Sequence, residues 1–172
     1  EEGPSDVASV DGSHIVGAAY LNVNGEKIWG NNHISLAKES SRLILGDVLA
    51  IEGAYVFAWQ NTAGRNVQFI GIEEEAGKLY SDTPISVSSS LFSKSRPRLA
   101  YRDIEDNADK AEIYIIWQES RLLGNIEIDG QLSTLDGDLQ WDDTGEEIIT
   151  NLGDQINHVV MSDDDDGVYV MW

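Results

Sequence analysis

The sequence predicts an all-β fold built from repeated four-stranded antiparallel sheets, and three observations support this prediction. The apolar segments are short and rich in β-branched and aromatic residues, with Gly, Asn and Asp between them. No segment sustains the 3.6-residue periodicity of an amphipathic helix over several turns. Two aromatic motifs recur in alternation along the chain, which is typical of a protein built from structural repeats.

Composition limits the class of protein. The 172 residues suffice for one domain with a hydrophobic core, and a hydrophobic fraction of 41% is typical of globular rather than disordered proteins. No apolar run approaches the roughly 20 residues of a membrane-spanning helix, so we expect no membrane span. The absence of cysteine excludes disulfides, thiolate metal sites and cysteine nucleophiles. Because the sequence starts at Glu1 without an initiator methionine, we expect a processed protein, which is consistent with secretion.

The formal net charge of −20 argues against nucleic acid as a partner, because binding phosphates needs clustered Lys and Arg. An acidic surface that keeps the protein soluble is the simplest interpretation. A medium rich in divalent cations, a high-salt habitat and a basic partner are the alternatives.

The first half of the chain is expected to form strands separated by Gly-containing turns. Residues 14–23 form the first predicted strand, and Asn24-Gly25 follows it as a turn signal. A second apolar run, residues 42–50, is broken at Gly46-Asp47. The strands after it are predicted at residues 54–59 and 66–72. Residues 34–45 are the nearest candidate for a helix, but β-branched residues and Ser40-Ser41 argue against one.

The same order of signals recurs in the second half. The predicted strands there are residues 99–101, 113–117, 125–128, 156–161 and 168–172. A polar loop is expected at residues 103–110, and the basic residues around Arg96-Pro97-Arg98 are interpreted as a loop that balances local acidity.

Two aromatic markers define the repeat. The first is a Trp at the end of a strand, and it occurs at Trp59, Trp117 and Trp172, at intervals of 58 and 55 residues. The second is a Gly followed after a short gap by an aromatic residue, and it gives Trp29, Tyr80 and Trp141. We therefore expect one β-repeat domain over residues 1–172. Its repeats would be roughly residues 30–80 and 81–141, with a third formed by residues 1–29 together with 155–172.

About four short strands per repeat fit the blade of a propeller. A four-stranded sheet that is apolar on both faces cannot bury them alone, so copies arrange around an axis. The count is about three blades, whereas propellers typically have 4–8. A second chain could complete the ring, or the chain could be part of a larger protein. The alternative fold is a β-sandwich in which an unpaired terminal strand is shared with a neighbouring chain.

The segments Asn24 to Trp29 and Asp136 to Trp141 resemble the blade ends of secreted bacterial β-propeller repeat proteins. They are similar to the tryptophan-docking motif of quinoprotein-like propellers, in which a Gly and a Trp a few residues later clip one blade to the next. The segment Glu75 to Tyr80 departs from it, with a shorter gap and Tyr in place of Trp. The resemblance implies a propeller fold but no activity, since those propellers include enzymes and non-catalytic scaffolds.

Few residues suggest chemistry. The run Asp163, Asp164, Asp165 and Asp166 before Gly167 supplies the hard oxygen ligands that Ca²⁺ prefers, so calcium is the one cofactor hypothesis. Its spacing does not match an EF-hand, and a solvated hairpin loop is the simpler interpretation. The tryptophans could stack on sugars, but their repeat-equivalent apolar positions favour the core. The three histidines, His14, His33 and His158, lack metal-ligand spacing.

No nucleophile elbow, phosphate loop or zinc-protease motif occurs, so we expect no catalytic residues. The sequence therefore predicts a non-catalytic extracellular or cell-surface β-repeat module for adhesion or protein assembly. Its expected partner is a second copy or another protein, with carbohydrate as the alternative. The competing hypotheses are a fibre subunit assembled by strand sharing, and a fragment of a propeller enzyme such as a glycosidase.

Overall fold

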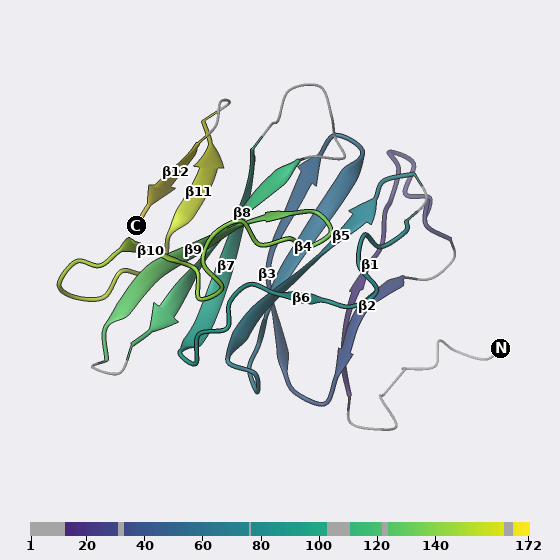
Figure 1. Cartoon of the computed structure of the whole chain (residues 1–172). Coiled ribbons are helices and arrows are strands. Elements are labelled where there is room, and N and C mark those ends of the chain that lie inside the picture. The colour runs from purple at the N-terminus through teal and green to yellow at the C-terminus, as the bar shows by residue number, and fades with distance from the viewer. Residues whose placement is uncertain (1–12, 31–32, 76, 103–110, 122–123, 164–166) are drawn as a thin grey trace.

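The structure, a computed structural model, is all-β and describes residues 13–30, 33–75, 77–102, 111–121, 124–163 and 167–172 (Figure 1). These residues form twelve strands and no helix. A helix of the length and hydropathy needed to cross a membrane is therefore not found in them.

The strands form four antiparallel sheets in which hydrogen-bonded neighbours follow chain order. The first sheet holds β1 (His14–Ala18) and β2 (Ile34–Glu39). The second holds β3 (Leu43–Ile51), β4 (Ala54–Asn61), β5 (Asn66–Glu73) and β6 (Ile85–Ser86). The third holds β7 (Ser93–Arg102), β8 (Glu112–Ser120), β9 (Ile126–Thr134) and β10 (Glu146–Ile149). The last holds β11 (Val159–Ser162) and β12 (Val168–Met171).

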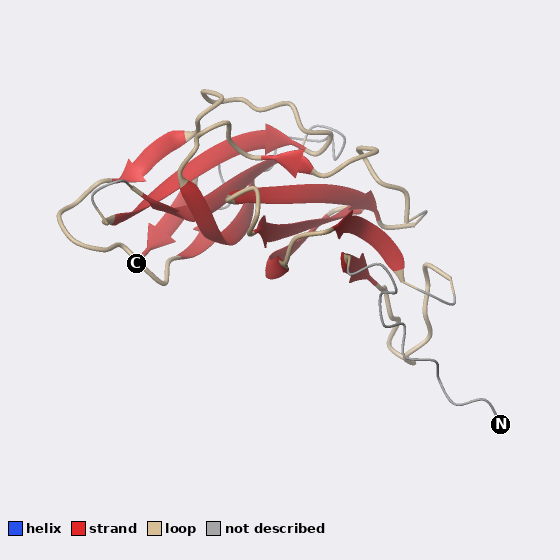
Figure 2. Ribbon diagram, turned by 90° about the horizontal axis from the view of Figure 1, so that it is seen from below, coloured by secondary structure: helices blue, strands red, loops and turns tan. Residues whose placement is uncertain are grey.

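The four sheets lie in a row in the order of the chain, with the two-stranded sheets at its ends (Figures 1 and 2). A hydrophobic core fills each of the three gaps between neighbouring sheets. The β4 strand shows why: Val56 and Ala58 join the core shared with the third sheet, whereas Trp59, on the opposite face, joins the core shared with β1–β2. Both faces of each four-stranded sheet are therefore covered, as their apolar sequences require.

Several expectations about local structure need correction. The first strand ends at Ala18 instead of continuing to residue 23, because the chain then turns and makes only an isolated bridge between Leu21 and Lys27. The argument against a helix at residues 34–45, in contrast, is confirmed, because both parts of this segment are strand. The basic segment around Arg96-Pro97-Arg98, expected to be a loop, lies in strand β7 together with Lys94.

The break expected at Gly46 is a β-bulge between Leu45 and Asp47, inside a continuous strand. A Cβ atom at Gly46 would overlap the ring of Pro97 on β7, so the glycine allows the second and third sheets to approach closely here.

The sheet boundaries lie beyond the expected repeat boundaries. Each four-stranded sheet includes a short strand that follows the aromatic marker, β6 after Tyr80 and β10 after Trp141. The segments expected to share one repeat, residues 1–29 and 155–172, do not pair with each other within the described residues. Instead β1 pairs with β2, and β11 pairs with β12, at opposite ends of the row (Figure 1).

Candidate functional site

The first set of aromatic markers occupies equivalent places in the two complete sheets. Trp59 on β4 and Trp117 on β8 are both fully buried, and each lies in the core shared with the preceding sheet. The indole nitrogen of Trp59 donates to Oε1 of Gln68 at 3.1 Å, and that of Trp117 donates to Oε2 of Glu119 at 3.0 Å. Both indoles are therefore structural and unavailable for stacking on a sugar. Trp172, in contrast, is more than half exposed.

The second set of markers joins each sheet to the next one. Trp29 donates its indole N–H to the carbonyl of Glu74 at 2.8 Å and packs against Gly77, in the turn after β5. Tyr80 packs in the core between the second and third sheets. Trp141 packs in the core beyond the third sheet, with its ring centroid 5.9 Å from that of Tyr114.

The C-terminal sheet exposes an apolar face. Val159, Met161, Tyr169 and Met171 alternate with inward residues along β11 and β12, and their exposed fractions run from 46% to 68%. They form cross-strand pairs, Val159 with Met171 and Met161 with Tyr169. We call these four residues the donor face. The opposite face of the same sheet packs on the third sheet, so the donor face is where a further sheet would lie.

The N-terminal end of the row carries a largely apolar groove. A depression of about 420 Å³ lies beside β1 over the outer face of β3 and β4. We call the apolar residues along it the acceptor groove: Val16, Leu45, Val48, Phe57 and Trp59. Leu45 is 74% exposed although its cross-strand partner Trp59 is fully buried. The difference arises because β1 and β2 cover only part of the outer face of the second sheet.

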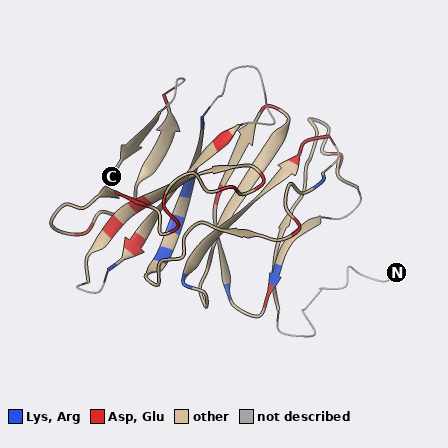
Figure 3. Cartoon of the chain, viewed as in Figure 1, with Lys and Arg blue, Asp and Glu red and all other residues tan. Residues whose placement is uncertain are grey.

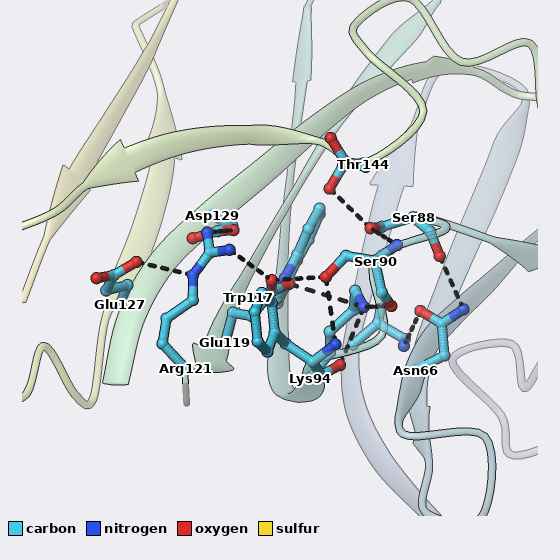
Figure 4. A network of polar contacts seen from close by, with 12 residues as sticks. Asn66, Ser88, Ser90, Lys94, Trp117, Glu119, Arg121, Glu127, Asp129 and Thr144 are labelled. Carbon is cyan, nitrogen blue, oxygen red and sulfur yellow. Dashed lines mark hydrogen bonds and ion pairs between the residues drawn. The ribbon is translucent and has the colours of Figure 1, made fainter. Parts of the chain in front are cut away.

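A buried charge network crosses the third sheet (Figure 4). Lys94 lies 3.7 Å from Glu119, and both side chains are fully buried. The Lys94 ammonium also donates to the carbonyls of Ser90 and Phe92, at 2.7 and 3.1 Å. The network joins β7 to β8, because Lys94 belongs to the first of these strands and Glu119 to the second.

Arg121 extends this network to β9 and β10. Its guanidinium contacts Glu119 at 3.3 Å, Glu127 at 2.8 Å, Asp129 at 2.7 Å and Glu147 at 3.1 Å. Four carboxylates thus surround one guanidinium. Positive and negative charges are also separated along the strands of this sheet: Lys and Arg gather on β7, whereas acidic residues lie on β9 and β10 (Figure 3).

Burial shifts the pKa values in this network. The pKa of Asp129 is raised to about 7, mainly by burial and then by the neighbouring Glu119 charge, and Arg121 offsets only part of this effect. Burial lowers the pKa of Lys94, while Glu119 opposes that shift. Shifted carboxyl and amine groups are found in active sites and also in structural ion-pair networks. Lys94 is satisfied by Glu119 and two backbone carbonyls, and Glu119 accepts hydrogen bonds from Ser90 and Trp117. This enclosure favours a structural role across the strands.

The calcium hypothesis gains no support from the described residues. Asp163 accepts the backbone N–H of Gly167 at 2.9 Å, as in a closed turn, while Asp164, Asp165 and Asp166 lie outside the described residues. The described part of the chain holds no group of three or more His, Asp or Glu side chains arranged for a metal ion.

Sequence reasoning located the aromatic markers but not the donor face, the acceptor groove or the charge network. The signal for the donor face was present, because all four residues from Val168 to Met171 are apolar, so a strand there has apolar side chains on both faces. The network had no such signal, since its members come from positions 90 to 147 and meet only when four strands align.

Comparison with protein-family models, with curated proteins and with solved structures gave no match.

Proposed function

We propose that this chain is a non-catalytic assembly module that associates with further copies of itself through its two incomplete end sheets. The donor face of one copy covers the acceptor groove of another, so that the halves β11–β12 and β1–β2 form a complete four-stranded sheet. In this arrangement the sheets continue around an axis as a propeller. The secreted or cell-surface setting suggested by the sequence suits such a module.

One observation carries the proposal: among the described residues, the sheet at each end of the row has half as many strands as the sheets between them. Each complete sheet has four strands, whereas each end sheet has two. Among the described residues β12 pairs only with β11, and β1 pairs only with β2, so each end presents an unpaired strand edge. Unpaired edges beside exposed apolar surface favour strand addition from another chain.

The apolar character of both surfaces supports association over independent solubility. Scattered exposed hydrophobic residues are ordinary, but here four adjacent side chains on one face and a groove at the other end are apolar. Other strongly exposed apolar residues, such as Val23, Leu91 and Leu152, lie outside these two surfaces. Burial of such patches is the main favourable contribution to protein association.

A matched set of charge substitutions tests the proposal. Met171→Glu on the donor face and Leu45→Glu in the acceptor groove place an unpaired carboxylate in the buried interface, which should raise the dissociation constant by about 100-fold or more. Leu152→Glu is the control, because Leu152 is fully exposed outside both surfaces. Sedimentation equilibrium should show association for the wild type and the control, and monomers for each of the two variants.

Mixing the two variants sharpens the test. The Leu45→Glu chain keeps an intact donor face, and the Met171→Glu chain keeps an intact acceptor groove, so an equimolar mixture should recover one working interface. A wild-type chain that sediments as a monomer up to millimolar concentration contradicts the proposal. So does a mixture that stays monomeric while each variant alone is folded by circular dichroism.

A fibre assembled by the same contacts is the second candidate. The two incomplete sheets lie at opposite ends of the row (Figure 1), and a head-to-tail contact that does not close produces an open filament. A continuous ladder of sizes that lengthens with concentration would select the fibre.

A further inference from the structure

We infer the specific partner and register of this assembly: β12 of one copy pairs antiparallel with β1 of a second copy, with Met171 opposite Ala18, and two copies close one ring. This inference rests on the proposed function and adds to it a strand pair, a register and a number of copies. Within the chain, β11–β12 and β1–β2 are the only two-stranded sheets among the described residues.

The turns identify β1 as a third strand of a unit. Three isolated bridges close a turn at the end of β5, at the end of β9 and shortly after β1, namely Ile72–Leu79, Ser133–Leu139 and Leu21–Lys27. One residue before each bridge, a carbonyl accepts an N–H from across the turn. Tyr20 accepts from Ile28 at 2.8 Å, Gly71 from Tyr80 at 3.0 Å and Leu132 from Gln140 at 2.8 Å. Because β5 and β9 are the third strands of their sheets, β1 holds the same place in an incomplete one.

The last strand corresponds to a second strand. β11 and β12 follow the third sheet as β7 and β8 follow the second, and β12 leads into Trp172 as β8 leads through Trp117. The side chains of β12 also point to the same faces as the corresponding side chains of β8. Val168 and Val170 pack toward the preceding sheet, as do Ile113 and Ile115 on β8, whereas Tyr169 points away, as Tyr114 does.

The two complete sheets then give the register. In the second sheet, Ala58 precedes the marker Trp59 and lies opposite Phe69, which is two residues before the accepting Gly71. In the third sheet, Ile116 precedes Trp117 and lies opposite Gly130, which is two residues before the accepting Leu132. Transferred to the end strands, this rule places Met171 opposite Ala18 and Trp172 opposite Gly17.

This register places Met171 over the acceptor groove. Ala18 is buried toward the second sheet, in the core that contains Trp59. Directly opposite residues of paired strands lie on the same face, so Met171 of the incoming copy also faces the second sheet. The exposed side chains of Leu45 and Val48 lie there, and Tyr169 reaches the same side two residues earlier. The pairing of β12 with β1 and the contact of Met171 with the acceptor groove thus require the same placement of the incoming copy.

The number of strands selects two copies. The described residues of each chain contribute two complete sheets and two halves, which make three units when the halves are joined. One chain closed on itself gives three units, two chains give six and three chains give nine. Propellers typically have 4–8 blades, so the closed assembly contains two copies and two identical interfaces.

Disulfide cross-linking in the full chain tests the register. The chain has no cysteine of its own, so Ala18→Cys together with Met171→Cys introduces the only thiols. Directly opposite residues lie about 4.5–5.5 Å apart between their Cα atoms, within disulfide reach. Oxidation should yield a covalent dimer of one size and no larger species. Without oxidant, the native mass should correspond to two copies for the wild type, for this double-cysteine variant and for the control variant described next.

The matched control is Val16→Cys with Met171→Cys. Val16 lies on the same face two residues away, a diagonal of about 7–8 Å that exceeds disulfide reach. Equal or better cross-linking of this control, or dimers by mass that neither pair cross-links, overturns the register but leaves the proposed function standing. A covalent ladder overturns closure by two copies, and an internally cross-linked monomer overturns the second copy as partner. A wild-type protein that is a monomer overturns the proposed function and this inference together.

Discussion

Asp129 shows how one buried carboxyl couples the fold to pH. One oxygen of its side chain lies 2.7 Å from the Arg121 guanidinium, and the other has no hydrogen-bond partner. Its pKa is about 7 in the folded protein, against an ordinary value of 3.8. The folded state therefore holds this proton more tightly than the unfolded chain does, and the resulting stabilisation is present at low pH and lost as pH rises through about 7.

Replacing Asp129 by Asn should remove this dependence. Between about pH 4 and 7 the wild type loses stability through Asp129 by roughly 1.4 kcal/mol per pH unit at most, and Asp129→Asn should not. Urea unfolding at several pH values measures both slopes. Asp138→Asn, at an exposed position, removes the same formal charge and should leave the slope unchanged. Parallel curves for wild type and Asp129→Asn would show that Asp129 ionises in the folded protein as it does in the unfolded one.

At the scale of the element, the connection between sheets depends on a glycine placed against a tryptophan. Gly77 has a φ of +59°, and a Cβ atom there would lie 2.8 Å from Cδ1 of Ile34 and 3.0 Å from the ring of Trp29. Glycine at this turn therefore serves both the left-handed backbone and the close approach of the preceding sheet.

Gly77→Ala should thus cost more than a turn glycine usually does. The left-handed backbone alone costs an alanine about 1–2 kcal/mol, and displacement of Trp29 adds about 1–3 kcal/mol. Gly25→Ala is a matched control, since Gly25 has a φ of +79° and open space where the Cβ atom would be. Urea unfolding of both variants separates the two contributions, and equal losses of stability would mean that Trp29 moves aside freely.

How far the sequence could predict these elements depends on the range of the interactions involved. The strands around Trp59 and Trp117 were predictable because β-branched alternation is a local signal. β6 and β10 were not, since Ile85-Ser86 and Glu146 to Ile149 become strands only by pairing with β5 and β9. The burial of Lys94 was unpredictable for a similar reason, because its partner Glu119 is brought to it by strand register.

At the scale of the whole molecule, the sequence predicts the repeated sheets but not how the sheets at the two ends are completed. The all-β prediction is confirmed. All the aromatic markers except Trp172 lie in the cores between successive sheets. The sequence pattern cannot show whether the two ends of the chain complete a repeat within one molecule or between two. The reason is that the pattern does not specify which copy supplies the neighbouring strand.

The charge of the whole molecule should make assembly depend on salt. Each chain carries a formal charge of −20, so joining two copies brings like charges together. Raising sodium chloride from 20 to 200 mM shortens the screening length from about 20 to about 7 Å and should strengthen association several-fold. Sedimentation at both concentrations measures this effect. Weaker association at the higher concentration would indicate that attractive ion pairs dominate the interface.

The position of β1–β2 and β11–β12 at the two ends of the row has a consequence for protein engineering. A circular permutant that opens between β2 and β3, and connects Trp172 to His14 through a short linker, would encode β11, β12, β1 and β2 as one continuous meander. Such a chain would carry three whole sheets in sequence order and would no longer need a strand from a neighbour. Two copies should therefore still join, face to face between the first sheet of one and the last sheet of the other, but without exchanging strands.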